Sequence, residues 1–180
     1  MSGQRPQPAA AAEAFALWVP VAVRYSDLDQ QGHANNAVYF TYFEQGRLGY
    51  FDALRRLGRA AAGEDPAPAP TTTRALQVAP GATDDQLELP LVVSEAACAY
   101  RRPIASLAPL AVGVRAARVG HASLVLEYAA CDEPGGVLYA TGSTTIVCVD
   151  PVSGRPRGLP TWTLAALRRL EPRLSAHRDS

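Results

Sequence analysis

The sequence predicts an α+β fold, in which one long helix packs against a mostly antiparallel sheet that curves around it. Apolar side chains recur at spacings of three and four residues over 39–57, which is typical of one face of a helix. Four later segments show β-strand patterning and are separated by short turn signals, as in an antiparallel meander. Hydrophobic residues make up 48% of the 180 residues, so the chain can bury a substantial core.

The N-terminal part is predicted to contain a tail and one strand. Residues 1–14 are rich in Ala, Pro and Gln and are expected to be disordered. The segment 15–25 alternates like a strand, and Pro20 within it favours a sheet edge or a bulge. A turn-rich loop over 26–35 then leads into the helix.

The long helix is predicted over 36–57. Asn35 or Asn36 is suited to cap its N-terminus, and Gly58 is suited to end it. Gly46 lowers the helix propensity, so we expect its use to be a close approach of the helix to another surface.

The second half of the chain is predicted to hold the sheet. The segment 59–90 is rich in Ala and Pro and is interpreted as a linker-like insertion with a short strand at 72–78. The main domain is expected over 15–160, followed by a helix at 161–174 and a tail, which together make up 161–180. The four strands of the meander are predicted at 91–100, 110–119, 123–131 and 137–149.

Composition and charge limit the classes of function. The 17 basic residues, all Arg, balance 17 acidic residues, and this argues against a nucleic-acid or membrane-surface binder. The chain has no run of about 18 apolar residues, so we expect no transmembrane helix. Cys98, Cys131 and Cys148 are widely spaced and are expected to be reduced and buried. We therefore expect a cytoplasmic protein without a metal site or a cofactor.

The most informative segment is the polar turn at 27–36, which reads DLDQQGHANN and runs into an aromatic-rich helix. A helix N-terminus offers free N–H groups and a positive dipole end, which can stabilise an oxyanion. Asp29 can act as a nucleophile or as a base for water, although Asp in a turn also commonly bonds its own backbone. Asp27 is expected to be structural rather than catalytic.

The segment 23–47, VRYSDLDQQGHANNAVYFTYFEQGR, resembles the hotdog-fold acyl-CoA thioesterases of the 4-hydroxybenzoyl-CoA thioesterase type. AYRRPI at 99–104, GHASLVLEY at 120–128 and TGSTTIVCVDPVSGRPRGLP at 141–160 resemble later segments of that family in the same order. The resemblance covers roughly residues 15–160. It implies a hotdog fold, with a curved antiparallel sheet wrapped around one central helix, and hydrolysis of an acyl-CoA to a carboxylic acid and free coenzyme A.

The resemblance also implies roles for residues of the turn. Asp29 matches the catalytic carboxylate, and a backbone N–H near Asn36 matches the group that polarises the thioester carbonyl. Some relatives carry His where this chain has Asn36, so its side chain is expected to orient the carbonyl by a hydrogen bond. Tyr25 matches a tyrosine that those relatives use near the site. His33 is either a partner of the base or a structural residue of the turn.

The aromatic face of the helix has two interpretations. Tyr39, Phe40 and Phe43 could line an acyl pocket, or they could belong to the hydrophobic core. Glu44 could be a second carboxylate near the site, or it could form an ordinary surface pair with Arg47.

Coenzyme A carries phosphates, for which arginines are suitable ligands. Arg101 and Arg102 lie at a predicted strand end, and Arg115 and Arg118 lie on the next strand. Each of the four could equally be an ordinary solvated surface residue.

Two other functions stay open at this point. One is a non-catalytic hotdog module that binds acyl-CoA, and the other is a hotdog dehydratase that acts on acyl thioesters with Asp29 and His33. The acyl donor is either coenzyme A or acyl carrier protein. A single hotdog leaves one sheet edge open, so we expect a homodimer or homotetramer with the active site at an interface that includes the Arg101–Pro103 region.

Overall fold

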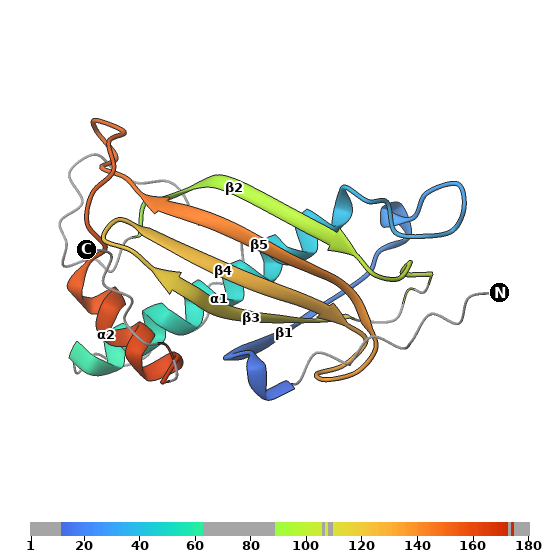
Figure 1. Ribbon diagram of the computed structural model, residues 1–180, viewed down its shortest axis with the longest axis horizontal. Coiled ribbons are helices and arrows are strands. Elements are labelled where there is room, and N and C mark those ends of the chain that lie inside the picture. Colours follow the sequence, from blue (N-terminus) through green and yellow to red (C-terminus); the bar gives the residue numbers. More distant parts are fainter. Residues whose placement is uncertain (1–11, 63–88, 106, 108–109, 173, 175–180) are drawn as a thin grey trace. The chain divides into compact units, whose positions relative to one another are not determined.

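The computed structural model describes residues 12–62, 89–105, 107, 110–172 and 174. It contains a five-stranded antiparallel sheet with the strand order β1-β3-β4-β5-β2 (Figure 1). The strands and helices are β1 (Leu17–Val21), α1 (Val38–Ala62), β2 (Leu91–Tyr100), β3 (Leu110–Val119), β4 (Ser123–Cys131), β5 (Leu138–Cys148) and α2 (Thr161–Leu170). The predicted combination of one long helix with an antiparallel meander is therefore confirmed.

The chain divides into two compact units, and α1 and the strands β2 to β5 contribute to both. The first unit comprises the described residues of 1–47, 97–115 and 127–143. The second comprises those of 48–96, 116–126 and 144–180. We describe each unit by itself.

In the first unit, β1 forms an edge of the sheet. It pairs antiparallel with β3, from Leu17 opposite Val114 to Val21 opposite Leu110. Pro20 lacks a backbone N–H, and an edge strand tolerates that loss because one side of it has no partner strand. The predicted edge position of Pro20 is confirmed.

The first half of α1 lies closely on one face of the sheet. A Cβ placed on Gly46 would lie 2.6 Å from Cγ1 of Val112, so the absence of a side chain permits the approach of the helix to β3. Phe43 stacks on Tyr128 of β4, with ring centroids 5.0 Å apart, and its ring also fills the space above Gly142 of β5. The expected use of Gly46 is therefore confirmed.

The second unit holds the other half of α1 together with α2. Tyr50, Phe51 and Leu54 continue the buried face of α1. The carboxylate of Glu171, just after α2, accepts hydrogen bonds from the Tyr50 hydroxyl at 3.0 Å and from the backbone N–H of Ala116 at 2.6 Å. Glu171 thus links α1, β3 and the end of α2 within this unit.

Three predicted boundaries are wrong. Gly58 does not end the helix, which runs from Val38 to Ala62. Among the described glycines only Gly32, Gly135 and Gly154 have positive φ, and the alanines at 60–62 favour continuation of the helix past Gly58. The first strand is shorter than 15–25, because the chain bends into a 3₁₀ turn at Tyr25–Asp27. The last helix ends at Leu170 rather than at residue 174.

The expected N-terminal tail is partly ordered. Ala12–Ala14 form a 3₁₀ turn, and the Trp18 indole donates to the carbonyl of Ala12 at 3.0 Å. Phe15 and Trp18 pack edge to face over Gly113 of β3, where a Cβ would lie 2.8 Å from the Phe15 ring. Residues 1–11 and 63–88, which hold the rest of the tail and the strand predicted at 72–78, lie outside the described residues.

Cys131 and Cys148 are buried, as predicted, whereas Cys98 on β2 is partly exposed. Within the described ranges, no helix combines the length and the apolar character needed to cross a membrane.

Candidate active site

The turn that carries Asp29 is closed by its own backbone. Leu28 and Ala34 form an isolated antiparallel bridge. The N–H of Asp29 donates to the carbonyl of His33 at 2.7 Å, and the N–H of Gly32 donates to the carbonyl of Asp29 at 3.0 Å. Gly32 has φ of 74°, a left-handed conformation that favours glycine. This local chemistry explains why the sequence forms a compact loop just before α1.

The carboxylate of Asp29 is held by one oxygen. Its Oδ1 accepts hydrogen bonds from the N–H groups of Gln31 at 2.8 Å and His33 at 3.1 Å. In the part of the chain that the structure describes, Oδ2 accepts no hydrogen bond, and Asp29 is exposed. Asp29 therefore bonds its own turn and also presents this second oxygen, and its catalytic role stays a prediction.

The start of α1 is capped by Asn35. Its Oδ1 accepts from the N–H of Ala37 at 2.9 Å, and its carbonyl accepts from the N–H of Val38 at 3.0 Å. The backbone N–H of Asn36 has no acceptor among the described residues. A free donor thus lies at the N-terminal end of the helix, where the dipole favours negative charge.

Tyr100, at the end of β2, fixes the peptide that follows Asn36. Its hydroxyl donates to the Asn36 carbonyl at 2.9 Å, while the N–H of the same peptide group, on Ala37, bonds Asn35. The ring of Tyr100 packs edge to face against Tyr39 with centroids 5.0 Å apart. Sequence reasoning missed Tyr100, although it lies within the AYRRPI segment that carries part of the resemblance.

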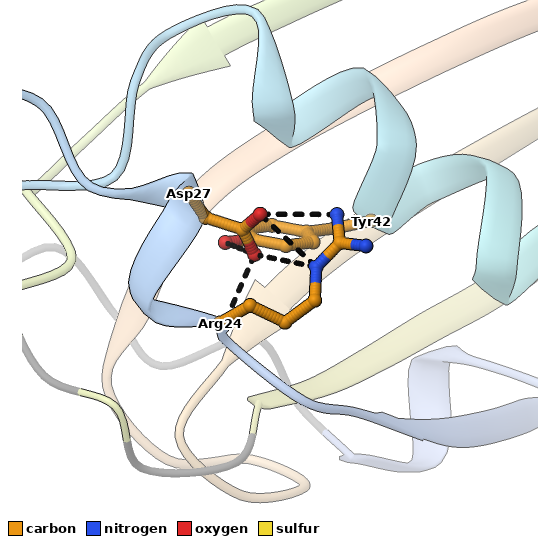
Figure 2. Close-up of polar contacts among 3 residues, drawn as sticks. All are labelled: Arg24, Asp27 and Tyr42. Atoms are coloured by element: carbon orange, nitrogen blue, oxygen red, sulfur yellow. Dashed lines mark hydrogen bonds and ion pairs between the residues drawn. The ribbon is translucent and has the colours of Figure 1, made fainter.

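A buried carboxylate lies two residues before Asp29. Asp27 is 2% exposed, and its Oδ2 accepts from the Arg24 N–H at 2.9 Å and from the Tyr42 hydroxyl at 3.1 Å. Its Oδ1 accepts from the Arg24 guanidinium, whose Nε lies at 3.1 Å and Nη2 at 3.0 Å, as Figure 2 shows. The expectation that Asp27 is structural agrees with this arrangement.

Electrostatics keep Asp27 ionised and Tyr42 protonated. Burial alone would raise the pKa of Asp27, but the hydrogen bonds from Arg24 and Tyr42 outweigh it and hold that pKa below its ordinary value. Burial and the hydrogen bond to the Asp27 carboxylate raise the pKa of Tyr42, so its hydroxyl remains a donor.

The other predicted residues of the turn are accessible. Tyr25 begins the 3₁₀ turn and is 83% exposed. His33 is partly exposed, and its imidazole makes no hydrogen bond within the described part of the chain. Neither of these described side chains forms a hydrogen bond or an ion pair with the buried Asp27.

The aromatic face of α1 belongs mainly to the core. Tyr39 and Phe43 are buried, and Phe40 is 40% exposed, so Phe40 is the accessible member of the three predicted pocket residues. Glu44 forms a surface ion pair with Arg47 at 3.2 Å, which agrees with the plainer of its two interpretations.

The predicted phosphate ligands differ in their surroundings. The side chains of Arg101 and Arg102 are exposed just after β2. The backbone N–H groups of both residues donate to the carbonyl of Tyr139, at 2.8 and 3.0 Å. Arg115 instead pairs with Glu127 at 2.6 Å and lies over the Phe15 ring at 5.5 Å. Arg115 therefore holds the N-terminal segment against the sheet, and this engagement argues against a phosphate role.

The chain matches an established family. The sequence pattern described as the Thioesterase-like superfamily covers residues 23–167. The chain therefore belongs to the Thioesterase-like superfamily, and its class is that of the thioester hydrolases. The hotdog fold and the family resemblance inferred from the sequence are both confirmed.

Individual relatives support the assignment. A thioesterase from Thermus thermophilus, solved in complex with coenzyme A and Zn, is 30% identical, with a TM-score of 0.64 and coverage of 90% of this chain and 99% of that one. The PA5185 protein from Pseudomonas aeruginosa strain PAO1 is 25% identical, with a TM-score of 0.64 and coverage of 92% and 97%. The uncharacterised protein YsmA of Bacillus subtilis (strain 168) is 27% identical over 149 residues, which are 83% of this chain and 81% of YsmA.

Proposed function

We propose that this protein is an acyl-CoA thioesterase, which hydrolyses its substrate to a carboxylic acid and free coenzyme A. One observation carries the proposal. Within the described residues, the segment before α1 presents a carboxylate oxygen of Asp29 and a backbone N–H of Asn36 that have no hydrogen-bond partner. These are a nucleophile or base and an oxyanion donor, in a chain of the Thioesterase-like superfamily.

The proposed reaction begins at the thioester carbonyl carbon. Either Oδ2 of Asp29 attacks that carbon directly, or it removes a proton from a water molecule that attacks. The carbonyl oxygen becomes an oxyanion, which the Asn36 N–H stabilises; one such donor is typically worth about 3 kcal/mol. The C–S bond then breaks and coenzyme A leaves as a thiolate. In the direct route, water hydrolyses the resulting anhydride and regenerates the Asp29 carboxylate.

Other groups around the turn would support the substrate. The exposed Asn36 side chain, which lies within hydrogen-bond reach of the Tyr100 hydroxyl, would orient the carbonyl, and the side chains of Tyr25 and His33 are accessible on the segment before α1. Phe40 would contact the acyl group, with Tyr39 and Phe43 behind it in the core. Glu44 would lie at the edge of the substrate site on its solvent side, which is consistent with its ion pair with Arg47.

Coenzyme A is the proposed carrier of the acyl group. The Thermus thermophilus relative was solved with coenzyme A, and Arg101 and Arg102 are exposed and close in sequence to Tyr100, which bonds the peptide after Asn36. Their guanidinium groups are suited to phosphate. An acyl carrier protein also presents a phosphopantetheine thioester, so a comparison of the two donors belongs in the assay.

We further propose a homodimer, or a homotetramer built from it, formed through β2. This strand lies at the edge of the sheet, and eight of its ten residues are exposed, including Val92 and Val93 at 48% each. An exposed apolar edge strand is suited to pair with a second copy, which would bring the Arg101–Pro103 region of the partner to the site. Sedimentation as a monomer at micromolar concentration would contradict this. A cytoplasmic location belongs to the same proposal.

The test is thiol release from a panel of short, medium, long and aromatic acyl-CoAs, with the matching acyl carrier protein thioesters alongside. A thioesterase releases one thiol for each carboxylic acid formed. Binding without thiol release would instead support a non-catalytic acyl-CoA module. Conversion of a 3-hydroxyacyl-CoA to the enoyl-CoA, without free thiol, would support a dehydratase. Rapid quench and intact-mass measurement would then show whether an acyl group becomes attached to the protein, as the direct route requires.

A further inference from the structure

We propose that Asp27 is a positioning residue for this reaction, which joins both ends of the catalytic turn to α1. The inference rests on the proposed function, because it concerns the placement of Asp29 and of the Asn36 N–H. Asp27 touches neither the substrate nor the reacting atoms, since it is 2% exposed.

The side chain of Asp27 makes the connection to the helix. Tyr42 lies on α1, and its hydroxyl donates to Asp27 Oδ2 at 3.1 Å. Arg24 lies at the entrance of the turn and donates from its backbone and its guanidinium to the same carboxylate. The close-up in Figure 2 shows dashed contacts that join this carboxylate to Arg24 and to Tyr42. The entrance of the turn and the helix therefore share one acceptor.

The backbone of Asp27 makes the connection to the far end of the turn. Its carbonyl accepts from the N–H of Asn35 at 2.8 Å. Asn35 is the cap of α1 and immediately precedes the free N–H of Asn36, while Asp29 lies two residues after Asp27. Both reacting groups are thus within two residues of atoms that Asp27 fixes. A shift of about 1 Å in such a group can cost about a hundredfold in rate.

The contacts need a carboxylate rather than an amide. Oδ2 accepts from the Arg24 N–H, from the Tyr42 hydroxyl and, at 3.4 Å, from Nε of Arg24. Oδ1 accepts from the same Nε at 3.1 Å and pairs with Nη2 at 3.0 Å. In an Asn side chain one of these two oxygens becomes an NH2 group, which is a donor and would face the N–H and O–H donors that the oxygen had accepted from. Asp27→Asn therefore disturbs either the link to the helix or the link to Arg24, with almost no change in volume.

The experiment measures Asp27→Asn and Tyr42→Phe, the double variant of the two, and each of them combined with Asp29→Asn. The substrate is an acyl-CoA that the wild type hydrolyses. We expect kcat to fall at least about tenfold in Asp27→Asn with KM within roughly threefold, because positioning of the reacting groups affects the transition state. Tyr42→Phe should lower kcat less, and it should add no further loss in the Asp27→Asn background. Asp52→Asn is the matched control, since it removes a partly exposed carboxylate that pairs with Arg56 on the same helix at 2.9 Å.

The combination with Asp29→Asn separates positioning from stability. If Asp27 places both groups, Asp27→Asn should lower kcat by a larger factor in the wild type than in Asp29→Asn, where only the placement of the Asn36 N–H remains to be lost. Its effect on the melting temperature should be the same in both backgrounds. Equal losses of kcat in both backgrounds would overturn the inference, and so would a folded Asp27→Asn with kcat within about twofold of the wild type.

The outcomes also separate this inference from the proposed function. Absence of thiol release by the wild type would remove the proposed function itself, whereas full activity of Asp29→Asn would remove the catalytic role of Asp29 and, with it, this inference. A large loss in Asp29→Asn, together with normal kcat in Asp27→Asn, would keep the function and refute the positioning role. If Asp27→Asn is unfolded at the assay temperature, Tyr42→Phe decides, because it removes one hydroxyl group and leaves the pair of Asp27 with Arg24 intact.

Discussion

Replacing Gly46 with Ala measures how closely α1 lies on β3. The added Cβ would lie 2.6 Å from Cγ1 of Val112 and 3.1 Å from Cγ2 of Val114. Carbon atoms in good contact are about 3.5–4.0 Å apart, so the shortest contact is about 1 Å too short. Both valines are fully buried, and a β-branched side chain on a strand has few rotamers with which to retreat. Overpacking of this kind costs about 1–3 kcal/mol.

The helix propensity acts in the opposite direction. Alanine is favoured over glycine within a helix by about 1 kcal/mol. We therefore expect Gly46→Ala to lower the free energy of unfolding by about 1 kcal/mol, within a range of about 0–2 kcal/mol. Urea unfolding followed by circular dichroism measures this quantity, provided that the m-value is unchanged.

A double-mutant cycle isolates the contact. Val112→Ala removes the methyl group at 2.6 Å, so Gly46→Ala should cost at least about 1 kcal/mol less in that background than in the wild type. The reasoning would be refuted if Gly46→Ala stabilised the protein by about 1 kcal/mol in both backgrounds, as expected for an uncrowded helix glycine.

Three further predictions follow from other contacts. Glu171→Ala leaves the buried Tyr50 hydroxyl and the Ala116 N–H without this acceptor, and should lower the free energy of unfolding in urea by about 1–3 kcal/mol. The isosteric Glu171→Gln keeps an accepting oxygen and should cost less, and an equal loss in the two variants would contradict the role of this shared acceptor. The pKa of Asp27 is lower in the folded protein than in the unfolded chain, so the ionised carboxylate stabilises the fold above the unfolded pKa of about 3.9, and this stabilisation is lost as the pH falls through the lower folded pKa. The difference in the free energy of unfolding between the wild type and Asp27→Asn should therefore narrow below about pH 4, and a constant difference would contradict this. Tyr100→Phe removes the hydrogen bond to the Asn36 carbonyl and should lower kcat about twofold to tenfold, while the free energy of unfolding changes by about 1 kcal/mol or less. An equal loss of kcat in the control Tyr139→Phe would argue against a specific role of Tyr100.

The strands of the sheet could be predicted from the sequence because the signals for them are local. Alternation and turn residues placed β2, β3 and β4 at their observed bounds, and Pro20 indicated the edge strand. The end of α1 could not be predicted in the same way. A glycine ends a helix only if the chain takes up a left-handed conformation there, and the alanines after Gly58 offer no reason to leave the helix.

The candidate site was accessible in part. The turn chemistry around Asp29 and the cap at Asn35 depend on neighbouring residues, and the sequence motif contains both. Tyr100 and Tyr42 were missed as site residues, because their hydroxyl groups bond partners 64 and 15 residues away. Tyr42 falls within the apolar periodicity at 39–57, and the burial of its ring agrees with that pattern. The hydrogen bond to Asp27 becomes visible only when the helix and the turn are in place.

The most direct test of the central claim is the rate of thiol release by Asp29→Asn. Asp52→Asn serves as the control, because Asp52 is an α1 carboxylate that pairs with Arg56. We expect kcat/KM for the best acyl-CoA to fall at least about a hundredfold in Asp29→Asn, with folding retained, and to stay within about twofold in Asp52→Asn. A folded Asp29→Asn with kcat/KM within about threefold of the wild type would contradict the account, and Asp29 would then be a residue that only shapes its turn.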